Sequence, residues 1–330
     1  MSQKIQVGFI PFNAGVPSDF LMTVKSSILR VSLRITGNLV VGVAPATLVA
    51  NGILNLVRKI EMRIGAIVKK VWGDGSILGA GAKLLYRKNI IEYGIIGELT
   101  QPAVSVGTNP FAVTLVIPYE MPPRISRNWQ NNSQRSTCLS PTALDHYIKL
   151  YWGTVADVAT LGGGGSVALT NCQVEVACTV EPLLDSVKMP LFLCESNQNV
   201  NIQAGINSND RQPLNKEGLL VGSALFGVDN GVDNDASFNT LDFLLNVNNS
   251  VLRRDWNGLK AGAREIAGLQ SALPAGLNYA LFDEGQNGDG IIPVGVPQFA
   301  RGWDLAVDHA ALTTVFALYA QHNYLEPQTW

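Results

Sequence analysis

Charge is the scarcest feature of this 330-residue chain. Asp, Glu, Lys and Arg make up 15% of it, against about a quarter in an ordinary soluble protein, and the mean hydropathy is positive. So little charge predicts that neighbouring protein molecules, or lipid, cover much of the surface. The formal net charge of -2 and the lack of any basic run argue against nucleic acid as a direct partner, because binding it normally requires a Lys/Arg-rich face.

Histidine and cysteine are also few. The three histidines are too scattered to supply the two metal sites of a duplicated cupin enzyme. The four cysteines show no metal-ligand spacing. They are Cys138, Cys172, Cys178 and Cys194. Two of them alternate with valines from Asn171 to Val180, so we expect both to point inward on a strand as free thiols, in a protein assembled in a reducing cytoplasm.

Targeting and membrane segments are missing as well. The opening residues, MSQKIQVGFIPF, contain neither a long apolar core nor a cleavage site, so we expect no signal peptide. The stretch from Ile35 to Val57 carries no charge and is long enough to cross a bilayer as a helix. However, Pro45 and the turn pairs Gly37-Asn38 and Asn51-Gly52 interrupt it. We therefore predict short strands joined by turns there.

What the chain does contain is an internal repeat. The stretch from Val68 to Lys83 (VKKVWGDGSILGAGAK) returns in shortened form from Leu252 to Arg264 (LRRDWNGLKAGAR). Two shorter echoes follow in the same order: Ala-Leu-Asp-His ending at His146 with Ala-Val-Asp-His ending at His309, and Val-Glu-Pro with Leu-Glu-Pro near the C-terminus. Collinear echoes at this spacing indicate two structural units of one kind.

The spacing between matched residues shrinks along the chain, so the first unit carries the insertions. One insertion contains the glycines at 162–165, which predict a flexible surface loop. We predict three parts: an N-terminal arm over residues 1–19, a first barrel with long loop insertions over 20–186, and a second barrel over 187–330.

Apolar and polar residues alternate with a period of two residues along much of the chain. Leu29, Val31, Leu33 and Ile35 alternate with polar residues, and similar short runs recur between turns rich in Gly, Pro and Asn. A helix is predicted over Leu259–Leu273, with a counterpart around Leu78–Tyr86. The sequence therefore predicts an all-β protein of two tandem eight-stranded antiparallel jelly-roll barrels with short flanking helices.

Catalytic chemistry finds little support. An Asp precedes both His146 and His309, but no Gly-x-Ser-x-Gly elbow or other placed nucleophile accompanies the pairs. Their duplication favours a structural role at equivalent strand starts. We expect no enzyme activity, no cofactor, and no catalytic, cofactor-binding or metal-binding residues.

Two other motifs allow alternative readings. The loop around Asp229–Asp235 resembles the beginning of a calcium loop, but Phe238 stands where Gly is expected and Leu244 where a Glu is expected. A solvated turn is favoured, with calcium binding left open. Trp72 and Trp256 match within the repeat and are expected to anchor the flanking helices, the alternative being a sugar-stacking platform.

Three longer stretches carry a resemblance: Phe111–Pro122 (FAVTLVIPYEMP), Thr142–Gly153 (TALDHYIKLYWG) and Gly302–Pro327. With the tandem units, they resemble the double jelly-roll major capsid proteins of tailless bacteriophages with an internal membrane, of the tectivirus, corticovirus and finnlakevirus kind. The resemblance lies in architecture and strand texture over most of the chain, because this family has no diagnostic short motif.

The resemblance implies a viral structural protein. Such a subunit forms pseudo-hexagonal homotrimers that tile an icosahedral shell around an internal lipid membrane, so the expected location is the virion capsid, assembled in the host cytoplasm. The implied partners are neighbouring trimers, vertex or penton proteins, minor capsid proteins and, for the N-terminal arm, the viral membrane. The insertions at Thr100–Ser140 and Thr154–Ser166 would supply towers or contacts between trimers. The alternative function is a receptor- or carbohydrate-binding jelly roll, like a spike or lectin.

Overall fold

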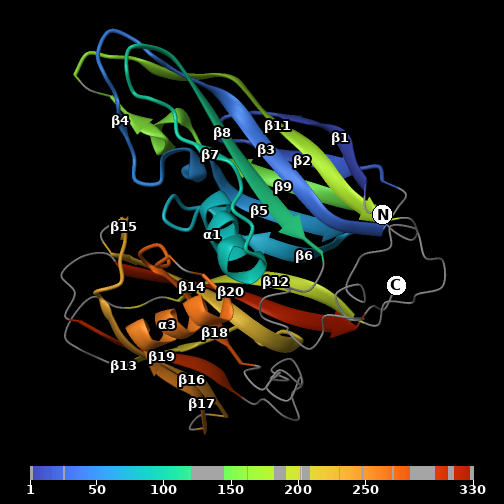
Figure 1. The fold of residues 1–330 in the computed structure, drawn as a ribbon, viewed down its shortest axis with the longest axis vertical. Helices are drawn as coiled ribbons and strands as arrows, with labels where there is room; N and C mark the ends of the chain where they lie inside the picture. The colour runs from blue at the N-terminus through green and yellow to red at the C-terminus, as the bar shows by residue number, and fades with distance from the viewer. Residues whose placement is uncertain are drawn as a thin grey trace.

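The computed structural model describes most of the chain. The described residues are 3–24, 27–119, 145–161, 163–181, 191–200, 202, 209–229, 231–246, 249–269, 271–282, 302–310 and 316–327. Cys138, most of the predicted Thr100–Ser140 insertion and the predicted boundary at residue 186 lie outside them. Figure 1 shows two β units, with the first above the second and helix α1 between them.

The first unit consists of two facing antiparallel sheets. One contains, in spatial order, β1 (Gln3–Pro11), β11 (Val167–Glu181), β3 (Ser27–Val41), β8 (Gly107–Pro118) and the short β7 (Leu99–Thr100). The other contains β6 (Ile67–Trp72), β5 (Val57–Ile64), β9 (His146–Trp152) and β2 (Pro17–Met22). At one end, β4 (Thr47–Leu48) pairs with β10 (Ala159–Thr160), beside the short 3-10 helices η1 (Gly52–Asn55) and η3 (Val155–Asp157).

The second unit repeats this arrangement. One sheet contains β12 (Leu191–Val200), β20 (Phe316–Pro327), β14 (Leu219–Asp229) and β18 (Leu277–Leu281), with the short β15 (Val232–Asp233) also on β14. The other contains β13 (Asn209–Pro213), β19 (Trp303–His309), β16 (Phe238–Leu245) and β17 (Asn249–Asp255). A short parallel bridge between β6 and β12, where Glu195 pairs with Lys70, joins the two units.

The two units have the same topology. Strands β1, β2, β3, β5, β6, β8, β9 and β11 of the first correspond in chain order and in spatial neighbours to β12, β13, β14, β16, β17, β18, β19 and β20 of the second. This interleaving of two four-stranded sheets is the jelly-roll pattern. The predicted fold, two tandem eight-stranded jelly rolls with flanking helices, is confirmed.

Alternating burial explains why these segments are strands. In β9 and in β19 every second side chain is buried, and the side chains between them are partly exposed. Val31, Leu33 and Ile35 enter the core of the first barrel, as their alternation predicted. Each barrel has its own core, and Trp72 belongs to the first and Trp256 to the second. One apolar face per strand is what a two-sheet sandwich must bury.

The helices differ in position from the prediction. α1 spans Gly81–Tyr93 and α3 spans Trp256–Ile266, whereas the sequence suggested Leu78–Tyr86 and Leu259–Leu273. α3 begins earlier because the Asp255 side chain accepts from Gly258 N at 2.8 Å, as an N-cap does. It ends earlier because Gly268 takes a left-handed φ of 61°. The Ala-Gly-Ala echo therefore starts α1 but lies in the middle of α3.

The predicted N-terminal arm is part of the first barrel from Gln3 onward, because β1 pairs with β11 from Gln3 to Pro11 and β2 pairs with β9. Alternating apolar residues in β1 pack on the first core, which accounts for this. The Asp-His echo is not structurally equivalent: His146 begins β9, whereas His309 ends β19. The uncharged Ile35–Val57 stretch runs through β3, β4 and η1, and no described helix is long and apolar enough to cross a membrane.

Candidate functional site

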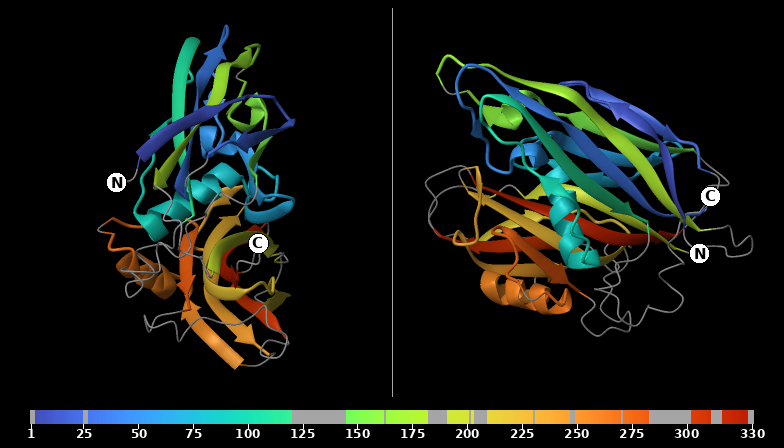
Figure 2. Two further views of the ribbon diagram at one scale, coloured as in Figure 1. Left: turned by 90° about the vertical axis from the view of Figure 1, so that its right-hand side faces the viewer. Right: turned by 45° about the horizontal axis from the view of Figure 1, so that its top comes forward.

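Helix α1 occupies the junction between the two barrels. It packs on β5, β6 and β8 of the first barrel. Its Leu84 and Ile91 also share an apolar cluster with β14 and β18 of the second barrel and with Ala263 of α3. The turned views in Figure 2 keep α1 between the barrels. Because α1 packs against both barrels, it joins them into one unit.

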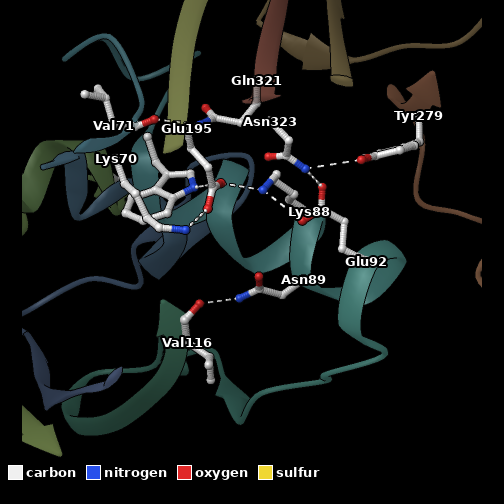
Figure 3. A network of polar contacts seen from close by, with 11 residues as sticks. Lys70, Val71, Lys88, Asn89, Glu92, Val116, Glu195, Tyr279, Gln321 and Asn323 are labelled. Atoms are coloured by element: carbon white, nitrogen blue, oxygen red, sulfur yellow. Dashed lines mark hydrogen bonds and ion pairs between the residues drawn. The ribbon is translucent and has the colours of Figure 1, made fainter. Parts of the chain in front are cut away.

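A buried polar network lies along this junction (Figure 3). Glu195 of β12 is its centre. Its carboxylate accepts from Lys70 Nζ at 2.8 Å and from Trp72 Nε1 at 2.9 Å, both on β6. Lys88 of α1 donates to the same carboxylate and also pairs with Glu92 Oε2 at 2.8 Å, one turn along the helix. Two lysines and two glutamates thus balance in charge across the junction.

The second barrel contributes amides and a phenol to the network. Asn323 Nδ2 donates to the Glu92 carboxylate and lies 3.2 Å from Tyr279 Oη. Gln321 Nε2, on the same strand β20, donates to the backbone oxygen of Val71 at 2.6 Å. These side chains are buried. Apart from the Lys88–Glu92 pair within α1 and the bond between Asn323 and Tyr279, these bonds join an element of the first barrel to one of the second.

Burial and ion pairing set the protonation states. Burial by itself would raise the pKa of Glu195, but the charges of Lys70 and Lys88 outweigh it and lower that pKa to about 2. Burial raises the pKa of Glu92, and the nearby Glu195 charge adds to the effect. Glu195 is therefore ionised at neutral pH. Burying ions without such pairing would be strongly unfavourable.

Two further groups of ion pairs connect the two barrels beside this network. Asp233, next to the second barrel's β14, pairs with Arg87 at 2.7 Å and with Lys83 at 3.4 Å, both on α1. Lys69 of β6 pairs with Glu326 of β20 at 2.7 Å. The polar junction, as we call Lys70, Trp72, Lys88, Glu92, Glu195 and Asn323, is thus flanked by ion pairs between barrels. Its central side chains are shielded from solvent.

The three histidines do not come together. His322 Nδ1 lies 2.8 Å from Ser223 Oγ, and His309 Nδ1 lies 2.8 Å from the oxygen of Ala310. His146 lies edge-on to Tyr119, with ring centroids 6.3 Å apart. Burial lowers the pKa of both His146 and His322 to about 4. Among the described residues, no hydrogen bond joins His322 to a carboxylate.

The carboxylates of the acidic loop around Asp229–Asp235 accept hydrogen bonds from other groups of the protein. Asp235 accepts from Trp256 Nε1 at 2.8 Å, from Lys260 Nζ at 2.5 Å and from Gly276 N at 2.9 Å. Asp229 accepts from Ser237 Oγ at 2.8 Å. Within the described residues, no three His, Cys, Asp or Glu side chains are grouped to hold a metal ion. The loop's carboxylates tie it to α3 and α1.

The cysteines and tryptophans have core positions. Cys178 and Cys194 are buried and Cys172 is half-buried, all as free thiols. Burial raises the pKa of Cys172 and Cys178 to about 12. Both tryptophans of the repeat are fully buried beside the start of the helix region, which matches the anchoring interpretation and leaves no exposed stacking platform at either residue.

No protein-family model and no curated protein sequence matches the chain. Solved structures match over nearly its whole length. A chain of the Sulfolobus Turreted Icosahedral Virus aligns with a TM-score of 0.69 at 12% identity, covering 98% of this chain and 90% of that one. The PBCV-1 virus capsid aligns with a TM-score of 0.65 at 10% identity, covering 98% and 93%.

A bacterial virus gives the same result. The major capsid protein P2 of bacteriophage PM2 aligns with a TM-score of 0.59 at 9% identity, covering all of this chain and 98% of its own. Two tandem barrels with one topology define a double jelly-roll protein. The fold of this chain is the double jelly roll of viral major capsid proteins, as its resemblance to that family implied.

Proposed function

We propose that the protein is the major capsid subunit of a virus. The observation that carries the proposal is the match of both barrels, in order and over 98 to 100% of the chain, to capsid proteins of viruses. The polar junction supports it, because a shell tile must keep its two barrels in one orientation. The low share of charged residues supports it too, since contacts in a lattice cover much of each subunit.

The proposed assembly is a homotrimer. Three copies of a two-barrel subunit place six similar walls around one axis and produce a nearly hexagonal tile. Such trimers would contact neighbouring trimers, vertex proteins and minor capsid proteins in a shell around an internal membrane, after assembly in the host cytoplasm. The proposed role is structural, without catalysis or cofactor. We also propose that the chain divides into its two barrels near residue 186.

The decisive experiment is the mass and shape of the purified protein. Analytical ultracentrifugation should give three times the 35.4 kDa chain mass, and negative-stain electron microscopy should show a hexagonal outline. Mixing with lipid vesicles then tests the internal membrane separately. A stable monomer that binds glycans on an array would overturn the capsid function and favour a lectin-like protein.

A further inference from the structure

Three side chains of the polar junction bring an amine and a carboxamide to one carboxylate. Lys88 Nζ lies 2.8 Å from Oε2 of Glu92, and Asn323 Nδ2 donates to Oε1 of the same side chain. Figure 3 shows the amine and the carboxamide reaching this carboxylate from α1 and from β20. An amine, a carboxamide and a carboxylate that can carry protons between them are the groups that an amide cross-link between two side chains requires.

Burial holds these groups together and excludes water. The side chains of Lys88 and Glu92 are 1% and 0% exposed, and Asn323 is fully buried. Tyr279 is buried beside them, with its Oη 3.2 Å from Asn323 Nδ2. The folded chain thereby replaces the encounter of two separate molecules with groups already in place, and water does not compete for the carboxamide.

The carbonyl of Asn323 has no partner. Within the described part of the chain no donor reaches its Oδ1, although the atom is shielded from solvent. A buried amide oxygen that accepts no hydrogen bond calls for an explanation, because leaving it unpaired is unfavourable. The fold thus binds only the nitrogen of this carboxamide and leaves its carbonyl group unengaged, and the carbonyl carbon is the atom that an amine would attack.

The charges of the site determine how fast such an attack would be. Burial raises the pKa of Glu92, so this carboxylate can accept a proton from a neighbouring ammonium. Burial by itself would lower the pKa of Lys88, but the charges of Glu195 and Glu92 outweigh it and raise that pKa. The neutral amine is therefore the minor form, and a reaction through it would be slow compared with folding.

We propose that Lys88 and Asn323 form an amide bond within the folded chain, with Glu92 as the proton carrier. Lys88 passes one proton to Glu92, and its Nζ then attacks Cγ of Asn323, so that a C–N bond forms. Glu92 gives its proton to Nδ2 and takes another from Nζ. The Cγ–Nδ2 bond breaks and one molecule of ammonia leaves, so the reaction consumes no oxidant and no other reactant.

The product contains fewer buried ions than the starting state. After the reaction Lys88 Nζ belongs to a neutral amide, and Glu92 keeps the proton as a neutral acid. Lys70 and Glu195 remain as a balanced pair at 2.8 Å, so less charge is held away from water. The bond would join α1 of the first barrel covalently to β20 of the second. This chemistry takes place once within one chain and does not depend on the proposed capsid function.

Mass spectrometry of the purified full-length protein tests the bond. The intact mass should be lower by one ammonia than the sequence requires, in a fraction of the chains that grows with incubation. Because other asparagines can also lose ammonia, the tryptic peptides decide. Trypsin cleaves after Arg87 and Arg301, so fragmentation should find the peptide that begins at Lys88 joined to the one that begins at Gly302, with the link at Lys88 and Asn323.

Three variants assign the roles of the side chains. Lys88→Arg keeps the positive charge but has no amine that can lose its proton, so it should give no linked peptide. Glu92→Gln keeps both reacting groups and should form the link about a hundred-fold more slowly. Gln321→Leu is the matched control, because it removes another buried carboxamide of β20 that bonds to the first barrel, and it should retain the link. Circular dichroism and melting temperature show whether each variant is folded.

The peptide map of the unchanged chain decides the proposal even where a variant fails to fold. If prolonged incubation of the folded protein yields only the separate peptides, the amide bond is overturned and the capsid function is unaffected. A link that forms at the same rate in folded Glu92→Gln overturns the assignment of Glu92 as proton carrier. A link in the unchanged protein and in Gln321→Leu, absent from Lys88→Arg and slow in Glu92→Gln, supports the proposal.

Discussion

Trp72 ends β6 and Trp256 directly follows the corresponding strand β17, yet their indole N–H groups donate to carboxylates of different barrels. Trp72 donates at 2.9 Å to Glu195 of the other barrel, and Trp256 donates at 2.8 Å to Asp235 of its own barrel. Both rings are fully buried. In each barrel the repeated tryptophan is thus buried beside a helix. In the first barrel it also forms a hydrogen bond to the second barrel.

This difference predicts unequal effects of one substitution. Trp72→Phe and Trp256→Phe remove similar packing, but Trp72→Phe also removes a donor from a completely buried carboxylate. Asp235 is partly exposed and keeps Lys260 and Gly276. We expect Trp72→Phe to lower the free energy of unfolding by about 1–2 kcal/mol more than Trp256→Phe. Chemical denaturation of both variants measures it, and equal losses would contradict the assigned role of Glu195.

The ionised centre of the polar junction gives a larger prediction. Glu195→Gln keeps the shape of the side chain but leaves Lys70 and Lys88 buried with only Glu92 to balance them. Removing one partner of a buried ion pair costs about 3–5 kcal/mol. Glu98→Gln, which removes an exposed carboxylate that pairs with Arg34, is the matched control and should leave the denaturation midpoint unchanged. Similar midpoints for the two variants would show that the network does not stabilise the junction.

Buried histidines predict how stability depends on pH. In the folded protein the pKa of His146 and of His322 is lowered to about 4, from 6.5. Because the folded pKa is depressed, the stabilisation is complete above pH 6.5 and is lost as the pH falls toward 4, where the unfolded chain binds protons that the folded chain does not. The loss is up to about 1.4 kcal/mol per pH unit for each histidine.

Denaturation curves between pH 7 and pH 4.5 check this. His322→Gln should reduce the slope of stability against pH, because one of the two groups no longer takes up a proton on unfolding. A slope identical to that of the unchanged protein would exclude His322 as a source of the acid sensitivity.

Backbone geometry after Trp72 makes one glycine irreplaceable. Gly73 has a φ of 82°, and a Cβ there would lie 2.3 Å from the oxygen of Arg58. Gly73→Ala should cost more than about 2 kcal/mol of unfolding free energy. Gly262, inside α3, has nothing within 4 Å of such a Cβ, so Gly262→Ala should stabilise by about 0.5–1 kcal/mol. If Gly73→Ala and Gly262→Ala changed the melting temperature in the same direction, the predicted difference between the two glycines would be wrong.

The barrels could be predicted because the alternation of apolar and polar residues is a local property of each strand. Val31, Leu33 and Ile35 alternate with polar residues, and that alternation needs only one buried face per strand. The tryptophan repeat also marked equivalent places in the two barrels, since Trp72 ends β6 and Trp256 directly follows the corresponding strand β17. The Asp-His echo misled because His146 and His309 stand at opposite ends of their strands, and short identities do not encode where a strand begins.

The polar junction could not be read from the chain. Lys88 and Glu92, four residues apart on a helix, look like an ordinary exposed ion pair. Lys69-Lys70 has the same appearance as Arg253-Arg254, which is indeed exposed. Lys70 is buried because β12 of the other barrel packs against β6. The low total charge predicted only that neighbouring molecules or lipid cover much of the surface, and it did not indicate a buried network.

The pairing of β1 with β11 has a consequence for synthesis of the chain. Gln3 of β1 lies opposite Val180 of β11, so β1 leaves the ribosome well before the strand with which it pairs. At elongation rates of about 5–20 residues per second, that wait lasts roughly ten to thirty-five seconds. A somewhat shorter delay recurs in the second barrel, where Leu191 lies opposite Pro327. Nascent chains therefore spend most of translation with an unclosed sheet, and cellular holding factors that cover apolar strands during this interval should raise the yield of assembled protein.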